Sequence, residues 1–200
     1  SKDHDYTKNW SADNLLNYDR DFGEHSFDLT LLYGVEEVID HGTDVSARDF
    51  ASSLLSYNKL EAGDPERHSV NTYKSKETSL YQMARLNYNY SGKYMFTGTI
   101  RRDGFSGFGP DNKIGYFPSL GLGWVISRES FFNFEGIDYL KFRGSYGSTG
   151  RRAVSRYQTL PTVSRGPAYV FGDGASPSYG QYINKMANEN LGWEKTTGIN

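Results

Sequence analysis

Hydrophobic and polar residues alternate along several stretches of the chain. Between Ile114 and Ile126, one set of alternate positions is apolar almost throughout, whereas the other set is mostly small or polar. Successive side chains of a β-strand point to opposite faces, so this period of two predicts a strand whose two faces meet different surroundings. Gly115, Gly121 and Gly123 leave the second face nearly bare.

The same alternation predicts about seven strands along the chain. The expected strands lie roughly at residues 6–19, 27–35, 79–90, 94–103, 114–126 and 140–148, with one more beginning at residue 191. The polar stretches 40–75 and 150–189 are rich in turn-forming residues and predict long loops.

The predicted connections alternate in length. Short turns are expected near residues 20–24, 91–92 and 128–138, and longer connections at 40–75, 104–113 and 150–189. An antiparallel meander with short turns on one rim and long loops on the other is the plan of an outer-membrane barrel. A soluble β-sandwich has no reason to keep this alternation.

The amino-acid composition limits which surroundings and which kinds of site the chain can have. The 200 residues include 16 Tyr, 12 Phe and 22 Gly, which suits β structure with many turns or with aromatic girdles at a membrane interface. The absence of cysteine excludes disulfides and thiolate metal sites, and the formal net charge of −2 gives no general reason to expect nucleic acid. The chain has no apolar run long enough for a membrane helix, and barrel strands need none.

The sequence contains no catalytic constellation. Its histidines stand apart in polar stretches, without metal-ligand spacing, at His4, His25, His41 and His68. Arg101 and Arg102 are adjacent and fit either phosphate binding at an outer rim or a structural salt bridge. We therefore predict that the chain is not an enzyme and needs no cofactor and no metal.

Both chain ends indicate a piece of a longer protein. The chain begins with Ser1 and shows no basic-then-apolar signal peptide, and it stops at Asn200 inside an alternating run. We expect residues 1–200 to form part of one larger domain.

Several short motifs closely resemble barrel segments of SusC/RagA-type TonB-dependent outer-membrane transporters. Their order and spacing match over roughly residues 80–200. The motifs are RRDG at 101–104, FGP at 108–110, GYFPS at 115–119, GW at 123–124, LKFR at 140–143 and LGWEKT at 191–196.

The resemblance implies an all-β fold, an antiparallel up-and-down meander that forms a wall segment of a large transmembrane β-barrel of roughly 22 strands. Residues 1–200 would all belong to the barrel domain, with the plug domain, signal peptide and TonB-contacting segment outside them. The implied function is import of oligosaccharides or peptides across the outer membrane of a Gram-negative, Bacteroidota-like cell. The implied partners are outer-membrane lipids, a SusD-like surface lipoprotein, and TonB through the missing N-terminal part.

In such a barrel, the two faces of the strand at 114–126 meet lipid and lumen. The apolar positions predicted to face lipid are Ile114, Tyr116, Leu120, Leu122 and Trp124. The small positions predicted to face the lumen and clear space for the plug are Gly115, Ser119, Gly121 and Gly123.

The loop at 150–189 carries aromatic residues among Gly and Ser. These residues are Tyr157, Tyr169, Phe171, Tyr179 and Tyr182. We expect them either to contact a ligand or a lid-like partner, or to pack on neighbouring loops.

Two other classes of protein stay open at this point. One is a small self-contained outer-membrane barrel that serves as an adhesin or structural protein. The other is a soluble β-sandwich that binds carbohydrate, for which more charges and fewer glycines are expected on the second faces.

Overall fold

The computed structural model describes residues 1–52, 54, 58–152, 154, 156–170, 172 and 177–200. Seven strands form one antiparallel sheet in the order β1-β2-β3-β4-β5-β6-β9, and β7 and β8 pair as a separate hairpin. The sheet strands are β1 (Lys2–Phe22), β2 (His25–Ser46), β3 (Ser69–Tyr90), β4 (Tyr94–Phe105), β5 (Ile114–Val125), β6 (Lys141–Arg151) and β9 (Glu194–Ile199); the hairpin is β7 (Thr162–Val170) and β8 (Pro177–Lys185), and short 3-10 helices lie at η2 (Leu60–Ala62), η3 (Pro65–Arg67) and η4 (Ile126–Arg128). The predicted all-β antiparallel meander is confirmed.

Residue contacts divide the chain into two compact units. Unit 1 contains residues 1–12 and 36–78, and unit 2 contains residues 13–35 and 79–200.

In unit 2, the register between β4 and β5 is continuous. β4 pairs with β5 from Tyr94 opposite Trp124 to Gly104 opposite Ile114, without a bulge among the described pairs. Because directly opposed residues share a face of a sheet, this register carries the alternation of β5 unchanged into β4.

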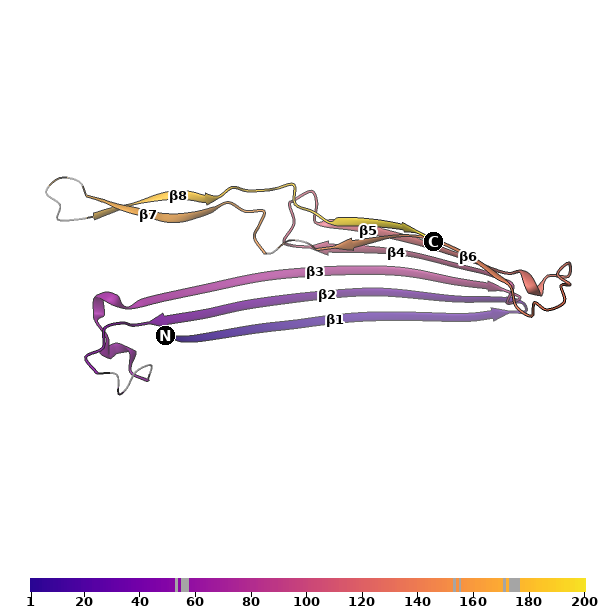
Figure 1. Ribbon diagram of the computed structural model, residues 1–200, viewed down its shortest axis with the longest axis horizontal. Coiled ribbons are helices and arrows are strands. Elements are labelled where there is room, and N and C mark those ends of the chain that lie inside the picture. The colour runs from indigo at the N-terminus through magenta and orange to yellow at the C-terminus, as the bar shows by residue number, and fades with distance from the viewer. Residues whose placement is uncertain (53, 55–57, 153, 155, 171, 173–176) are drawn as a thin grey trace. The chain divides into compact units, whose positions relative to one another are not determined.

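The short turns of unit 2 lie together at one end of its strands (Figure 1). Ser91 and Gly92 have positive φ values of 54° and 64°, the combination that a type I′ hairpin turn requires. The turns are also joined to one another. Ser91 N donates to the Glu24 carbonyl at 2.7 Å, and Arg128 Nη1 donates to the Gly92 carbonyl at 3.1 Å. We call this end the turn rim.

The long connections of unit 2 lie at the opposite end of its strands, at residues 106–113 and 152–193 (Figure 1). The connections at 23–24 and 91–93 are short, as predicted, but the connection 126–140 at the turn rim is longer than the connection 106–113 at the opposite end, so the predicted alternation in length is wrong around β5. In unit 1, the connection between β2 and β3 spans residues 47–68.

Two predicted loops were wrong in their extent. Residues 40–46 and 69–75, expected in a loop, belong to β2 and β3, and residues 150–189 contain the hairpin β7–β8. Residues 40–46 and 69–75 are mostly polar on both faces, and the hairpin mixes apolar residues such as Val163 and Ile183 with polar ones on both faces, so neither shows a regular hydropathy pattern.

Tyrosines of β3 lie across glycines of β2 to reach aspartates of β1. In unit 2, Tyr81 donates a hydrogen bond to Asp13 Oδ1 at 2.5 Å, and a side chain at Gly34 would overlap with the Tyr81 ring. A bare glycine thus makes room for an aromatic ring from the neighbouring strand, which restores the packing that glycine lacks. Unit 1 holds a second set of the same kind, in which Tyr73 donates to Asp5 across Gly42. Each of these residues lies eight positions from its counterpart in the first set.

The described residues bury few apolar side chains. Those below a tenth exposed are Phe105, Phe108, Phe117 and Val125. Many large apolar side chains stand exposed instead, including Leu122 at 55 % and Phe142 at 62 %. A water-soluble domain of this length buries most of such surface in a core, so the apolar face of this sheet requires an apolar environment outside the chain.

Candidate functional site

The two faces of β5 differ in chemistry and in exposure. Ile114, Tyr116, Leu120 and Leu122 are exposed on one face, and Trp124 is half-buried there. Gly115 is buried on the other face, where Ser119, Gly121 and Gly123 are half-buried. We call these the apolar face and the glycine face of unit 2.

The glycine face carries a network of polar side chains. Asn87 Nδ2 donates to Asp28 Oδ1 at 3.1 Å, and Thr97 Oγ1 donates to Asn87 Oδ1 at 2.9 Å. Arg85 Nε donates to Thr99 Oγ1 at 3.3 Å. These bonds run between neighbouring strands, so this face is built for polar surroundings.

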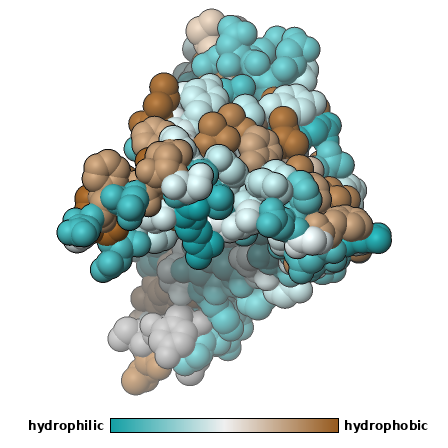
Figure 2. Space-filling view, turned by 90° about the vertical axis from the view of Figure 1, so that its right-hand side faces the viewer, coloured by the Kyte–Doolittle hydropathy of each residue, from teal (hydrophilic) through white to brown (hydrophobic). Residues whose placement is uncertain are grey.

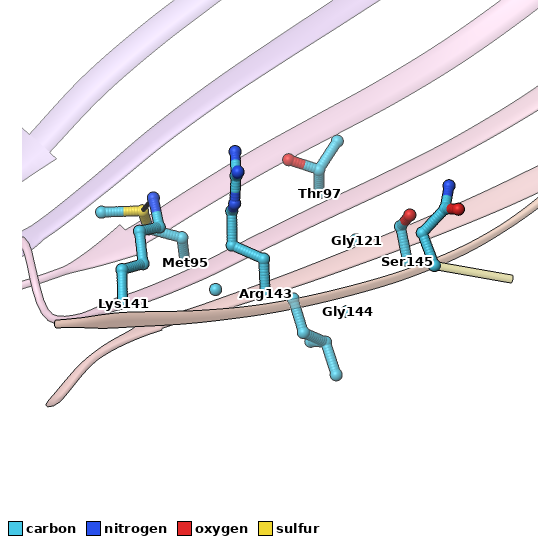
Figure 3. Close-up of a pocket in the computed structure, with 10 residues that line it drawn as sticks. Met95, Thr97, Gly121, Lys141, Arg143, Gly144 and Ser145 are labelled. Carbon is cyan, nitrogen blue, oxygen red and sulfur yellow. Dashed lines mark hydrogen bonds between the residues drawn. The ribbon is translucent and has the colours of Figure 1, made fainter.

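A recess of about 530 Å³ opens on the glycine face of β4, β5 and β6 (Figure 3). Met95, Thr97, Lys141, Arg143 and Ser145 stand on the same side of the sheet around it. The residues that line the recess are Met95, Thr97, Gly121, Leu122, Gly123, Lys141, Arg143, Gly144, Ser145 and Asn200. We call it the basic recess.

The two cations of the basic recess lack a counter-ion within the described part of the chain. No carboxylate among the described residues lies within ion-pair distance of Lys141 or Arg143. Lys141 Nζ lies 2.9 Å from the Met95 sulfur, a weak neutral acceptor that leaves the positive charge in place. The arrangement is therefore suited to an anion.

On the apolar face, aromatic rings gather beside the turn rim. The rings of Tyr90 and Tyr94 stack at 6.2 Å between centroids, and those of Tyr94 and Trp124 at 6.5 Å. An apolar hollow of about 380 Å³ lies among Tyr88, Tyr94, Met95, Phe96, Leu122, Gly123, Trp124 and Phe142. Figure 2, which looks onto the end that carries the turn rim, shows brown hydrophobic side chains exposed there.

Glu129, in the connection after β5, receives the polar ends of this aromatic group. Tyr94 Oη donates to Glu129 Oε1 at 2.5 Å, Trp124 Nε1 donates to the same oxygen at 3.0 Å, and Lys93 Nζ lies 3.5 Å from Oε2. The hydrogen bond from Tyr94, followed by that from Trp124 and the charge of Lys93, lowers the pKa of the Glu129 carboxyl below its ordinary value.

At the loop end of unit 2, the rings of Phe105, Phe108, Phe117 and Trp193 form a cluster. The Phe108 and Trp193 rings meet edge to face at 5.1 Å, as do Phe117 and Trp193 at 5.4 Å. Gly109 N donates to the Leu191 carbonyl at 3.1 Å. The cluster therefore joins the connection 106–113 to the segment that precedes β9.

The predicted loop aromatics are not brought together in one group. Tyr169 packs on Gly180, and the Arg165 guanidinium lies 3.2 Å from the centre of the Tyr179 ring. By the register of the hairpin, Tyr182 opposes Ser164 and Tyr179 opposes Ala168, so strand alternation puts these two tyrosines on opposite sides. Tyr157 lies in the loop before β7, and Phe171 lies outside the described residues.

The arginine pair is split between the two faces. Arg101 forms an ion pair with Asp103 at 2.8 Å, which agrees with the structural interpretation. Arg102 is paired with Tyr116 of β5 and therefore lies on the apolar face, where it donates to Gln82 Oε1 at 2.9 Å.

The histidines do not form a group. His25 forms a hydrogen bond with the Tyr88 hydroxyl at 2.8 Å, and His41 packs on Tyr6. No group of three metal-binding side chains occurs among the residues that the structure describes.

Sequence reasoning missed the basic recess and Glu129. The chain gave a signal for the recess, because Lys141 and Arg143 alternate on the face opposite Phe142. The role of Glu129 had no such signal, since it depends on the folding back of the connection that follows β5.

In the part of the chain that the structure describes, no helix is both long and apolar enough to cross a membrane.

A scan of protein families matches the whole chain, residues 1–200, to the barrel model described as "TonB dependent receptor-like, beta-barrel". The chain belongs to the TonB-dependent receptor family. The predicted resemblance and the place in the outer membrane are thereby confirmed, and a receptor family agrees with the prediction that the chain is not an enzyme.

Among curated TonB-dependent receptors, receptor P3 of Formosa agariphila is 35 % identical over 189 residues, covering 94 % of this chain and 18 % of its own. SusC of Bacteroides thetaiotaomicron is 34 % identical over 200 residues, which cover 98 % of this chain and 19 % of SusC. The chain thus spans about a fifth of the length of these relatives.

Solved structures of the RagAB peptide transporter share the fold. One has a TM-score of 0.70 at 23 % identity, covering 98 % of this chain and 21 % of that chain. A "closed-closed" state of the RagAB peptide importer has a TM-score of 0.72 at 23 % identity, with the same coverage.

Proposed function

We propose that the chain is a wall segment of a TonB-dependent importer, about seven strands of a barrel of roughly 22. The observation that carries this proposal is the single sheet with one apolar and one polar, glycine-rich face, in a chain of the TonB-dependent receptor family. Its role is that of scaffold and lumen wall, and no step of covalent chemistry is assigned to it.

The apolar face, under this proposal, meets lipid through Ile114, Tyr116, Leu120, Leu122 and Trp124. Their exposure in a chain with few buried apolar side chains supports this orientation. Tyr94 and Trp124, with their polar ends on Glu129, suit the boundary between lipid and water, where an aromatic ring has one apolar and one wet end.

The glycine face, with Gly115, Ser119, Gly121 and Gly123, lines the lumen in this proposal. A plug domain outside the 200 residues would occupy that lumen, together with a signal peptide and a TonB-contacting segment elsewhere in the protein. The hydrogen-bonded polar network on this face supports a wet or protein-filled interior.

The substrate class that we propose is oligosaccharides or peptides. Similarity to SusC and to the RagAB peptide transporter supports this class. We propose TonB as the source of energy, in line with the family description, and a SusD-like surface lipoprotein as partner. The exposed residues Tyr157, Tyr169, Tyr179 and Tyr182, together with Phe171, are proposed contacts for ligand or partner.

The test is uptake by cells that express the full-length gene or a version without its TonB-contacting segment. Growth on defined polysaccharides and peptide mixtures as sole carbon source, together with uptake of the supporting compound in labelled form, measures import. We expect both to depend on the gene and on the TonB-contacting segment. Adhesion that depends on the gene, with unchanged uptake of every compound, would instead identify an adhesin.

A further inference from the structure

We propose that the basic recess binds a carboxylate side chain of the protein segment that fills the barrel interior, with Lys141 and Arg143 as its donors. This inference rests on the proposed function, because it requires a barrel whose lumen is occupied. It goes further by naming the place and the chemistry of one contact between wall and filling segment.

Charge complementarity identifies the kind of partner. Lys141 and Arg143 lie two residues apart on β6, so strand alternation directs both side chains to the glycine face. A guanidinium binds a carboxylate through two parallel hydrogen bonds, and a nearby ammonium adds a third donor. Such a pair of neighbouring cations without an ion-pair partner among the described residues favours a negative partner.

Two acids of the same face are engaged elsewhere. Asp28 accepts a hydrogen bond from Asn87, and Asp103 pairs with Arg101. Because no described carboxylate forms an ion pair with Lys141 or Arg143, we place the counter-charge of the recess outside the described residues.

The glycines of β5 provide the space for that partner. A Cβ at Gly121 would have no neighbour closer than Thr97 Cβ at 3.8 Å, so the floor of the recess is open above this residue. A Cβ at Gly123 would lie 3.2 Å from Lys141 Cε, so this glycine lets the lysine stem lie against the sheet. The recess of about 530 Å³ has room for an inserted side chain and for water.

Hydroxyl groups beside the cations complete the polar lining. Thr97 and Ser145 stand on the same side of the sheet as Lys141 and Arg143 (Figure 3). The Thr97 hydroxyl already donates its proton to Asn87 Oδ1, so it adds polarity to the lining, and the Ser145 hydroxyl is the one that would donate a hydrogen bond to a bound carboxylate.

The first experiment places a photo-crosslinking residue, p-benzoylphenylalanine, at Ser145 of the full-length transporter and maps the crosslinked peptide by mass spectrometry. We expect a crosslink to the plug, in a stretch that contains Asp or Glu. A crosslink only to transported ligand, only to barrel residues that follow Asn200, or to nothing would overturn the proposal.

The second experiment measures how fast a protease cleaves the plug in the assembled transporter. Lys141→Gln together with Arg143→Gln should raise the cleavage rate roughly ten- to a hundredfold, the range expected for loss of hydrogen bonds to a charged group. Arg85→Gln is the matched control, because Arg85 is a cation of the same face that bonds Thr99 outside the recess. Equal rates in the double variant and the control would contradict the assignment.

The outcomes separate this proposal from the importer itself. A transporter that imports its substrate normally and crosslinks from Ser145 to another partner disproves the carboxylate contact alone. A protein that imports nothing but crosslinks to an acidic stretch of the plug disproves the importer and keeps the contact.

Discussion

The indole Nε1 of Trp124 donates to Glu129 Oε1 at 3.0 Å, so the end of β5 is tied to the connection that follows it. Tyr94 donates to the same oxygen from the neighbouring strand. One carboxylate thus joins two strands and the turn rim at the point where aromatic rings end and polar groups begin.

Glu129→Ala should loosen the turn rim, because both aromatic donors lose their acceptor. We expect the Trp124 fluorescence to shift to the red and the thermal midpoint of the refolded barrel to fall by roughly a few degrees. Glu129→Gln keeps an acceptor oxygen without the charge and should give a smaller change. Identical spectra for wild type and Glu129→Ala would show that the contact does not hold Trp124 in place.

Acidification should release the same contact. The hydrogen bonds lower the pKa of Glu129 in the folded state, so its contribution to stability is fully present above the unfolded-state pKa. That contribution is lost as pH falls through the folded-state pKa. A titration of Trp124 fluorescence from neutral to acidic pH should show a transition that is absent in Glu129→Gln, and a transition shared by both would have another source.

Substitution of Gly34 should disrupt the crossing of Tyr81 over β2. Any side chain there overlaps the ring, and overpacking of this kind destabilises by about 1–3 kcal/mol. Tyr81→Phe removes the hydroxyl that donates to Asp13 and should cost about 1 kcal/mol. Gly198→Ala is the control, because a Cβ at Gly198 meets nothing within 4 Å. Urea unfolding of the barrel followed by electrophoretic mobility measures all three.

The alternation of apolar and polar residues predicted the strands whose two faces differ in polarity. It did not predict the strands whose two faces are alike. The strand 114–126 was found within a residue of β5, because its apolar and glycine faces contrast at every step. The ends of β2 and β3 and the hairpin β7–β8 were missed because neither face of these stretches is consistently apolar. The crossing of Tyr81 over Gly34 depends on register among three strands, which a linear sequence does not display.

Charge scanning should distinguish the two faces of β5. Leu120→Lys exposes a cation to lipid in the proposed orientation and should destabilise by about 2–4 kcal/mol near the middle of the bilayer. Ser119→Lys, one residue away on the glycine face, should leave membrane insertion intact. Folding into lipid vesicles, followed by the gel shift of the folded barrel, compares the two. The reverse ranking would mean that the faces are exchanged.

Replacement of Phe117 should separate the connection 106–113 from the segment before β9. Phe117 is 5 % exposed and packs on Trp193, and truncation of a buried Phe to Ala typically costs about 3–5 kcal/mol. We expect faster proteolysis within 106–113 and 188–193, while the turn rim keeps its protection. Phe142→Ala, at an exposed position of β6, is the matched control.

The hydrogen bonds of the turn rim also bear on the order of folding. The turns 23–24 and 91–93 are short and are joined by the hydrogen bond from Ser91 to Glu24, whereas the connection 106–113 at the opposite end is longer. Closing a short loop loses less chain entropy, so strand pairing should begin at these two turns, in the hairpins β1–β2 and β3–β4. Pulsed hydrogen exchange during refolding would then find the amides near Ser91 protected first.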